Sequence, residues 1–126
     1  MIGGRVLDAS TIARFASGSS VYAAALVWTA VEENIVLAVP STAVAEACCD
    51  LPDPAQQVLD VLLHLPVTVV DDLDGSRARA VGGLGGPAPD AHALLCARDR
   101  GWPLVTADAP RYRGTDLAGV EVEQLP

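Results

Sequence analysis

The sequence contains no lysine, so all eight of its basic residues are arginines. A protein without lysine cannot form a Schiff base through a side-chain amine, and it cannot bind phosphate through an ammonium group. The glycine-rich stretch at residues 82–86 is therefore not a phosphate-binding loop, because such loops end in a lysine. Chemistry that depends on a side-chain amine is excluded.

Several other features are scarce or missing. Aromatic residues make up only 4% of the chain, so we expect an aliphatic core. The three cysteines are odd in number and lack the spacing of metal ligands, which is typical of a reduced, cytoplasmic protein. Residues 1–8 read as a strand rather than as a signal peptide. The most apolar run, residues 21–31, is too short to span a bilayer, and we expect it to form a buried helix.

The charge of the chain is strongly acidic, with 16 acidic and 8 basic side chains and a net charge of −8. This balance argues against a protein that covers duplex nucleic acid with a wide basic face, so any nucleic-acid contact must be local. The length of 126 residues and the hydrophobic content of 51% predict one globular domain that spans residues 1–126.

Strand and helix patterns alternate along the chain. Apolar, β-branched runs predict strands at residues 5–8, 35–39, 67–70, 103–106 and 120–125. Helical patterns occupy residues 10–16, 21–33, 42–49, 52–65 and 91–100, with Ser41 expected as an N-cap. Residues 75–89 predict a short helix and then a loop. Uninterrupted apolar strands between helices indicate an α/β fold, a three-layer α/β/α sandwich with a central parallel sheet.

Four acidic residues fall at one edge of this predicted sheet. Sites in open α/β sheets lie where the strands end and the helices begin. Asp8 ends the first strand, Asp108 follows a later strand, Asp90 opens a helix, and Glu46 lies in a helix that is apolar on nearly every face. Simpler roles remain open for three of them: an N-cap for Asp90, a turn for Asp108 and an exposed helix position for Glu46.

Oxygen ligands of this kind suit a hard cation. Mg²⁺ and Mn²⁺ accept carboxylates, hydroxyls and waters in octahedral geometry, and such a site activates water for attack on a phosphodiester. Ser10 follows Asp8 closely enough to add a hydroxyl oxygen.

Four segments resemble the motifs of the PIN-domain family in order and spacing, over almost the whole chain. They are Val6-Leu7-Asp8-Ala9-Ser10, Pro40-Ser41 through Ala45-Glu46-Ala47, Pro89-Asp90-Ala91-His92, and Leu104-Val105-Thr106-Ala107-Asp108. Each motif is short, so the specificity comes from the presence of all four on the expected elements. The loose glycine-rich stretch before Asp90 and the high acidity depart from the family pattern.

The resemblance implies a function as well as a fold. In this family, chiefly the VapC-like toxins of type II toxin-antitoxin pairs, the four matching acids bind Mg²⁺ or Mn²⁺ and support endoribonuclease activity. It therefore implies catalytic and metal-binding roles for Asp8, Glu46, Asp90 and Asp108. Ser10 and Thr106 match positions where the family often has a supporting hydroxyl. An RNA substrate and a small antitoxin are the implied partners.

Other polar residues have weaker assignments. Arg98, Arg100, Arg111 and Arg113 are candidates to hold the RNA backbone, with Arg111 and Arg113 preferred among them, although a solvated helix end and loop is the slightly favoured explanation. His92 is expected to have a surface or packing role. Asp71 and Asp72 end a strand at the same edge and are reserve candidates to support the metal ligands, although a role in a turn is favoured. The apolar run at residues 21–31 and the mean hydropathy of +0.34 favour a homodimer that covers part of this surface.

Two rival enzyme classes fail on particular residues. A phosphate-receiver domain has the same layer order, with Asp8, Asp71 and Asp72 as possible acids, but it needs a lysine. A haloacid-dehalogenase-like phosphatase also needs a lysine, together with a second aspartate where this chain has Ser10. A catalytically weak or inactive PIN-like interaction module remains the alternative to an active ribonuclease.

Overall fold

A five-stranded parallel sheet forms the centre of the protein, and its strand order is β3-β2-β1-β4-β5. The structure, a computed structural model, describes residues 3–113 and 119–126. The strands are β1 (Gly4–Leu7), β2 (Val36–Pro40), β3 (Thr68–Asp71), β4 (Leu104–Thr106) and β5 (Val122–Gln124). The helices are α1 (Ala9–Ser17), α2 (Val21–Glu33), α3 (Ser41–Cys48), α4 (Asp53–Leu63), α5 (Gly75–Leu84) and α6 (Ala88–Arg100), and a 3₁₀ turn η1 spans Ala109–Tyr112.

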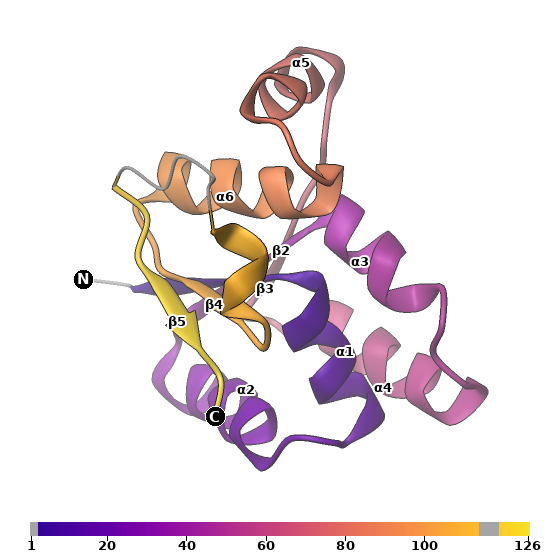
Figure 1. The fold of residues 1–126 in the computed structure, drawn as a ribbon. Helices are drawn as coiled ribbons and strands as arrows, with labels where there is room; N and C mark the ends of the chain where they lie inside the picture. Colours follow the sequence, from indigo (N-terminus) through magenta and orange to yellow (C-terminus); the bar gives the residue numbers. More distant parts are fainter. Residues whose placement is uncertain (1–2, 114–118) are drawn as a thin grey trace.

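Helices cover both faces of this sheet, as Figure 1 shows. Neighbouring residues of a strand point to opposite faces, so Val6 packs in the cluster under α6 while Leu7 packs in the cluster of α1, α2 and α4. Both strand residues are fully buried. The predicted three-layer α/β/α sandwich with a parallel sheet is therefore confirmed.

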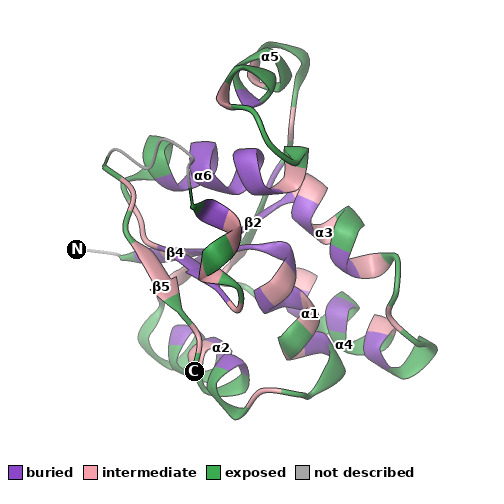
Figure 2. Cartoon of the chain, in the orientation of Figure 1, coloured by how far each residue is buried: buried purple, intermediate pink, exposed green. Residues whose placement is uncertain are grey.

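The segment between β3 and α6 is more helical than its glycines predict. Instead of a short helix and a loop, residues 75–84 form α5, which Asp74 caps by accepting a hydrogen bond from the backbone N–H of Arg77. α5 stands apart from the sheet beyond α6 (Figure 1) and is mostly exposed (Figure 2). Its one buried side chain, Val81, packs against α6 in a small apolar cluster.

Two helix beginnings differ from the sequence prediction. α6 starts at Ala88, because Pro87 occupies the N-cap position and Pro89 lies in the first turn, where no amide hydrogen is needed. Asp90 therefore lies inside the first turn instead of before it. The expected N-cap role of Ser41 is wrong: Pro40 is the N-cap, and the Ser41 hydroxyl accepts a hydrogen bond from Leu73 N.

The apolar helix α2 has the predicted bounds but is not buried. Only Ala23, Val27 and Ala30 are buried in this helix, Leu26 is partly buried against the core, and Trp28 is 69% exposed. The prediction of a buried helix was wrong because an all-apolar sequence does not say which face meets the sheet. No helix in the described part of the chain is long and apolar enough to cross a membrane.

Candidate functional site

Asp8 lies at the centre of the candidate site and is almost fully buried, with 1% of its surface exposed. It directly follows β1 and caps α1, because its Oδ1 accepts a hydrogen bond from Thr11 N at 3.0 Å. The Tyr112 hydroxyl donates to Oδ2 at 2.6 Å. Burial, together with the negative charge of Asp8, raises the pKa of Tyr112, so this phenol stays protonated and donates. No pattern in the sequence predicts that Tyr112 contacts Asp8.

Two hydroxyls connect Asp8 to the end of β4. Ser10 Oγ lies 2.7 Å from Asp8 Oδ1 and donates to it, and the same oxygen lies 3.2 Å from Thr106 Oγ1. Ser10 Oγ also accepts a hydrogen bond from Ala107 N, and Thr106 Oγ1 accepts one from Asp108 N. The structure therefore places both predicted supporting hydroxyls beside the acidic residues, where they fix the loop after β4.

Asp90 and Glu46 meet at the guanidinium of Arg111. Arg111 Nε and Nη2 lie 3.2 Å and 3.1 Å from the two oxygens of Asp90, and Nη2 lies 3.5 Å from Glu46 Oε1. Burial raises the pKa of Asp90 despite the opposing charge of Arg111, and the negative charges of Glu46 and Asp8 add to the rise. Acidic residues from β1, α3 and α6 thus share one small region.

The remaining two predicted site residues lie at the margin. Asp108 is exposed and immediately precedes η1, where its carbonyl accepts a hydrogen bond from Arg111 N. Arg113 is exposed at the end of the same turn. Of the two arginines proposed to bind substrate, Arg111 is the one that contacts the acids.

The donor set fits a hard divalent cation in its chemistry. Within residues 3–113 and 119–126, however, no three histidine, cysteine, aspartate or glutamate side chains are arranged closely enough to hold a metal ion. Asp90 and Glu46 instead pair with the guanidinium of Arg111. A cation at these carboxylates would have to displace Arg111, and Asp8, Glu46 and Asp90 are the residues that would hold it.

A groove with a volume of about 480 Å³ opens beside these acids. Glu46 and Arg111 line it, and Arg14, Ser17 and Asp50 extend the lining along α1 and past the end of α3. Its walls therefore carry both charge signs, with arginines next to carboxylates.

Comparison with solved structures identifies the fold. A chain in the crystal structure of VapBC2 from Rickettsia felis, bound to a DNA fragment from their promoter, matches with a TM-score of 0.69. The match covers 98% of this chain and 99% of that chain at 14% sequence identity. The fold is PIN-like. No protein-family model and no curated protein matches the sequence.

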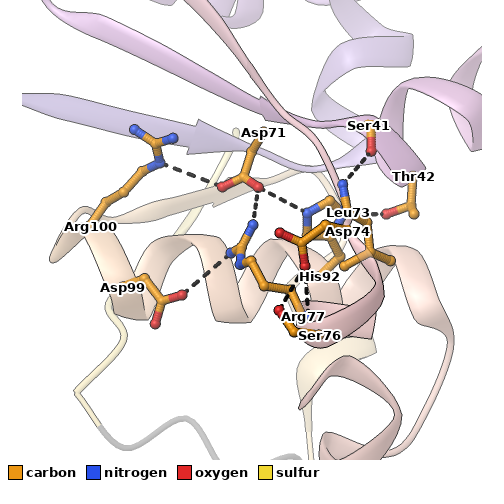
Figure 3. Close-up of polar contacts among 10 residues, drawn as sticks. All are labelled: Ser41, Thr42, Asp71, Leu73, Asp74, Ser76, Arg77, His92, Asp99 and Arg100. Atoms are coloured by element: carbon orange, nitrogen blue, oxygen red, sulfur yellow. Dashed lines mark hydrogen bonds and ion pairs between the residues drawn. The ribbon is translucent and has the colours of Figure 1, made fainter. Parts of the chain in front are cut away.

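The protein also contains a buried polar cluster that the sequence did not predict (Figure 3). At its centre is Asp71, the last residue of β3, which was expected to form a turn but is only 7% exposed. Arg77 from α5 pairs with its Oδ1, and Arg100 from α6 lies 3.6 Å from its Oδ2. Burial alone would raise the pKa of Asp71, but hydrogen bonds from Cys96, Arg77 and His92 lower it to about 2.

His92 belongs to this cluster and has no exposed surface. Its Nε2 lies 3.3 Å from Asp71 Oδ1, and its Nδ1 lies 2.7 Å from Thr42 Oγ1. Burial lowers the pKa of His92, so the ring is neutral at pH 7. The ionised Asp71 can only accept, so Nε2 carries the proton and Nδ1 accepts from the Thr42 hydroxyl. The expected packing role of His92 holds, but the packing is polar.

Proposed function

We propose that this protein is a metal-dependent endoribonuclease that hydrolyses RNA phosphodiester bonds with Mg²⁺ or Mn²⁺, as the toxin of a toxin-antitoxin pair. The observation that carries the proposal is the convergence of Asp8, Glu46 and Asp90 from three separate elements. Burial is the main cause of the raised pKa of Asp90, and the negative charges of Glu46 and Asp8 add to it because the three carboxylates lie near one another. Such a concentration of negative charge favours a bound cation.

Each residue of the site has a defined part in the proposed reaction. A divalent ion, when bound, would activate water and stabilise charge on the phosphate. Asp8, Glu46 and Asp90 would hold the ion, with Asp108 adding charge at the margin. Ser10, Thr106 and Tyr112 orient the carboxylate of Asp8 and the loop after β4 through their hydroxyl hydrogen bonds. Arg111, once displaced from Asp90, and the exposed Arg113 are placed to contact the RNA backbone.

The partners of the proposed toxin follow from the same site. The groove beside Glu46 carries Arg14 and Arg111, which makes it the path we propose for the RNA strand. The matched solved structure is a VapBC2 assembly, which supports a small antitoxin as the protein partner. We also propose that the protein is a homodimer and acts in the cytoplasm.

An RNA cleavage assay with matched variants tests the proposal. We expect wild-type protein to cleave single-stranded RNA with Mg²⁺ or Mn²⁺ but not in chelator. Asp8→Asn should lose more than the roughly 10–100-fold typical of residues that only support a metal ligand. Asp60→Asn, the same change at an exposed position on α4, should cleave like wild type. Equal cleavage by wild type and Asp8→Asn would instead identify a contaminating nuclease.

The second candidate function is a catalytically weak or inactive PIN-like interaction module. The contact of Arg111 with Asp90 and Glu46 favours it, because the guanidinium already neutralises two of the acids. A wild-type protein that cleaves no RNA and whose melting temperature does not respond to millimolar Mn²⁺ would establish this alternative.

A further inference from the structure

His92 connects three elements of the fold through one imidazole (Figure 3). The residue lies on α6, two positions after Asp90, and its two ring nitrogens bind Thr42 at the beginning of α3 and Asp71 at the end of β3. These partners are 50 and 21 residues away in the sequence, so the contact belongs to the tertiary structure.

Two side chains hold the beginning of α3: the Ser41 hydroxyl accepts a hydrogen bond from Leu73 N, and the Thr42 hydroxyl binds His92 on α6. Its buried residues are the small Ala43 and Ala47, Val44 and Cys48 are partly buried against the same core, and Gln56 binds Cys48 at the other end of the helix. Its N-cap is Pro40, which provides no side-chain hydrogen bond. The hydrogen bond of 2.7 Å from the Thr42 hydroxyl to the fixed imidazole therefore restrains the beginning of the helix directly.

Thr42 and Glu46 are four residues apart, so they lie one turn apart on the same side of α3. Two connections thus join α3 to α6: Thr42 to His92 at one turn, and Glu46 through Arg111 to Asp90 at the next. Because both connections are made by one helix, we expect a shift of α3 at the first to change the separation of Glu46 from Asp90 at the second.

We propose that His92 is a positioning residue, whose buried imidazole, held between Asp71 and the Thr42 hydroxyl, fixes α3 against α6 and thereby sets the separation of Glu46 from Asp90. Asp71 is a firm anchor for the ring because Arg77 and Arg100 hold both of its oxygens. The hydrogen-bonded series Thr42, His92, Asp71 also has the residue types of a catalytic triad, with a nucleophile, a base and an orienting acid. His92 has no exposed surface, however, so it cannot reach a substrate.

Three variants separate positioning from general stability. Thr42→Val keeps the shape of the side chain but removes the hydroxyl that binds His92, and Thr42→Ser keeps the hydroxyl. Thr68→Val is the matched control, since Thr68 Oγ1 also makes one partly buried hydrogen bond, to Leu62 O at 2.7 Å, but away from His92. Thermal melting in chelator comes first, and we expect Thr42→Val and Thr68→Val to lose comparable stability.

The first measurement is the affinity for Mn²⁺ by calorimetric titration, and it rests on the proposed function. We expect Thr42→Val to bind Mn²⁺ roughly 10-fold more weakly than wild type, the loss typical of residues that orient metal ligands. Thr42→Ser and Thr68→Val should bind like wild type. An equal loss of affinity in Thr42→Val and Thr68→Val would overturn the positioning role.

The second measurement needs no metal. The NMR signal of the Arg111 Nε–H group, assigned by its loss in Arg111→Gln, reports on the bridge between Glu46 and Asp90 in the metal-free protein. We expect Thr42→Val to shift or broaden this signal, and Thr42→Ser and Thr68→Val to leave it unchanged. If the wild-type protein binds no Mn²⁺ but the Arg111 signal still responds to Thr42→Val, the positioning role is supported while the metal assignment fails. An Arg111 signal that ignores Thr42→Val overturns the inference.

Discussion

At the scale of single residues, the acidic site depends on the balance between Asp90 and Arg111. The pKa of Asp90 is raised, so its ionised carboxylate is less favourable in the folded than in the unfolded chain. Burial would lower the pKa of Arg111, but the charges of Asp90 and Glu46 outweigh burial and raise it. The guanidinium therefore stabilises the fold, while the charge on Asp90 opposes it.

This balance predicts opposite effects on stability for two variants that each remove one charge, measured in chelator at pH 7. Asp90→Asn should melt no lower than wild type, because it removes a charge that the fold disfavours. Arg111→Gln should lose about 1 kcal/mol of unfolding free energy, because two carboxylates lose their cation. The difference between Asp90→Asn and wild type should vanish as the pH falls and Asp90 takes up a proton. A larger loss in Asp90→Asn than in Arg111→Gln, by denaturant unfolding, would show that Asp90 is a structural residue.

At the scale of elements, α2 leaves an apolar stripe in contact with solvent. Val21, Ala24, Trp28 and Val31 are all exposed and follow the three- and four-residue spacing with which two helices pack along a seam. The helix carries Glu32 and Glu33 at its C-terminal end and has no basic residue. Antiparallel pairing of two copies would place these acids beside the N-terminus of the partner helix, where negative charge is favourable.

We therefore predict that the homodimer forms through α2. Trp28→Glu should convert the protein to a monomer at micromolar concentration, because it places a charge in the middle of the seam. Val58→Glu makes the same kind of change on α4, where Val58 is 37% exposed, and should remain dimeric. Light scattering distinguishes the two states, and a wild-type monomer would contradict the prediction.

At the scale of the whole molecule, Asp71 connects β3, α5 and α6 and should control acid stability. Its folded pKa of about 2 lies below the ordinary value of 3.8. A lowered carboxyl pKa contributes stability that is complete above pH 3.8 and is lost as the pH falls toward 2. The size of this contribution is about 2 kcal/mol, since one pKa unit corresponds to about 1.4 kcal/mol.

Asp71→Asn should accordingly unfold about 2 kcal/mol more easily than wild type at pH 7. Its stability should also change less than that of wild type between pH 4 and pH 2, because the titrating group is gone. Asp60→Asn, which removes an exposed carboxylate on α4, serves as the control and should retain the wild-type acid profile. Parallel acid profiles for Asp71→Asn and wild type would show that Asp71 does not drive acid unfolding.

Local patterns in the sequence were sufficient to predict the order of the helices and strands and part of the candidate site. α2 has the predicted bounds because its apolar run is closed by a polar N-cap and by Asn34 in the left-handed conformation. Asp8 was placed correctly at the end of β1, since a charged residue directly after an apolar strand marks the edge of a parallel sheet. These features depend on neighbours within one or two turns of the chain.

Contacts between distant segments were decided by the tertiary structure alone. The sequence does not indicate that Thr42, Asp71 and His92 share one buried cluster, because their contacts span 50 and 21 residues. Nor does it indicate that Arg111 meets Asp90, or that Trp28 is left exposed. Side-chain type and spacing determine which element forms, whereas the packing of helices on the sheet determines which polar groups meet and which apolar face remains in solvent.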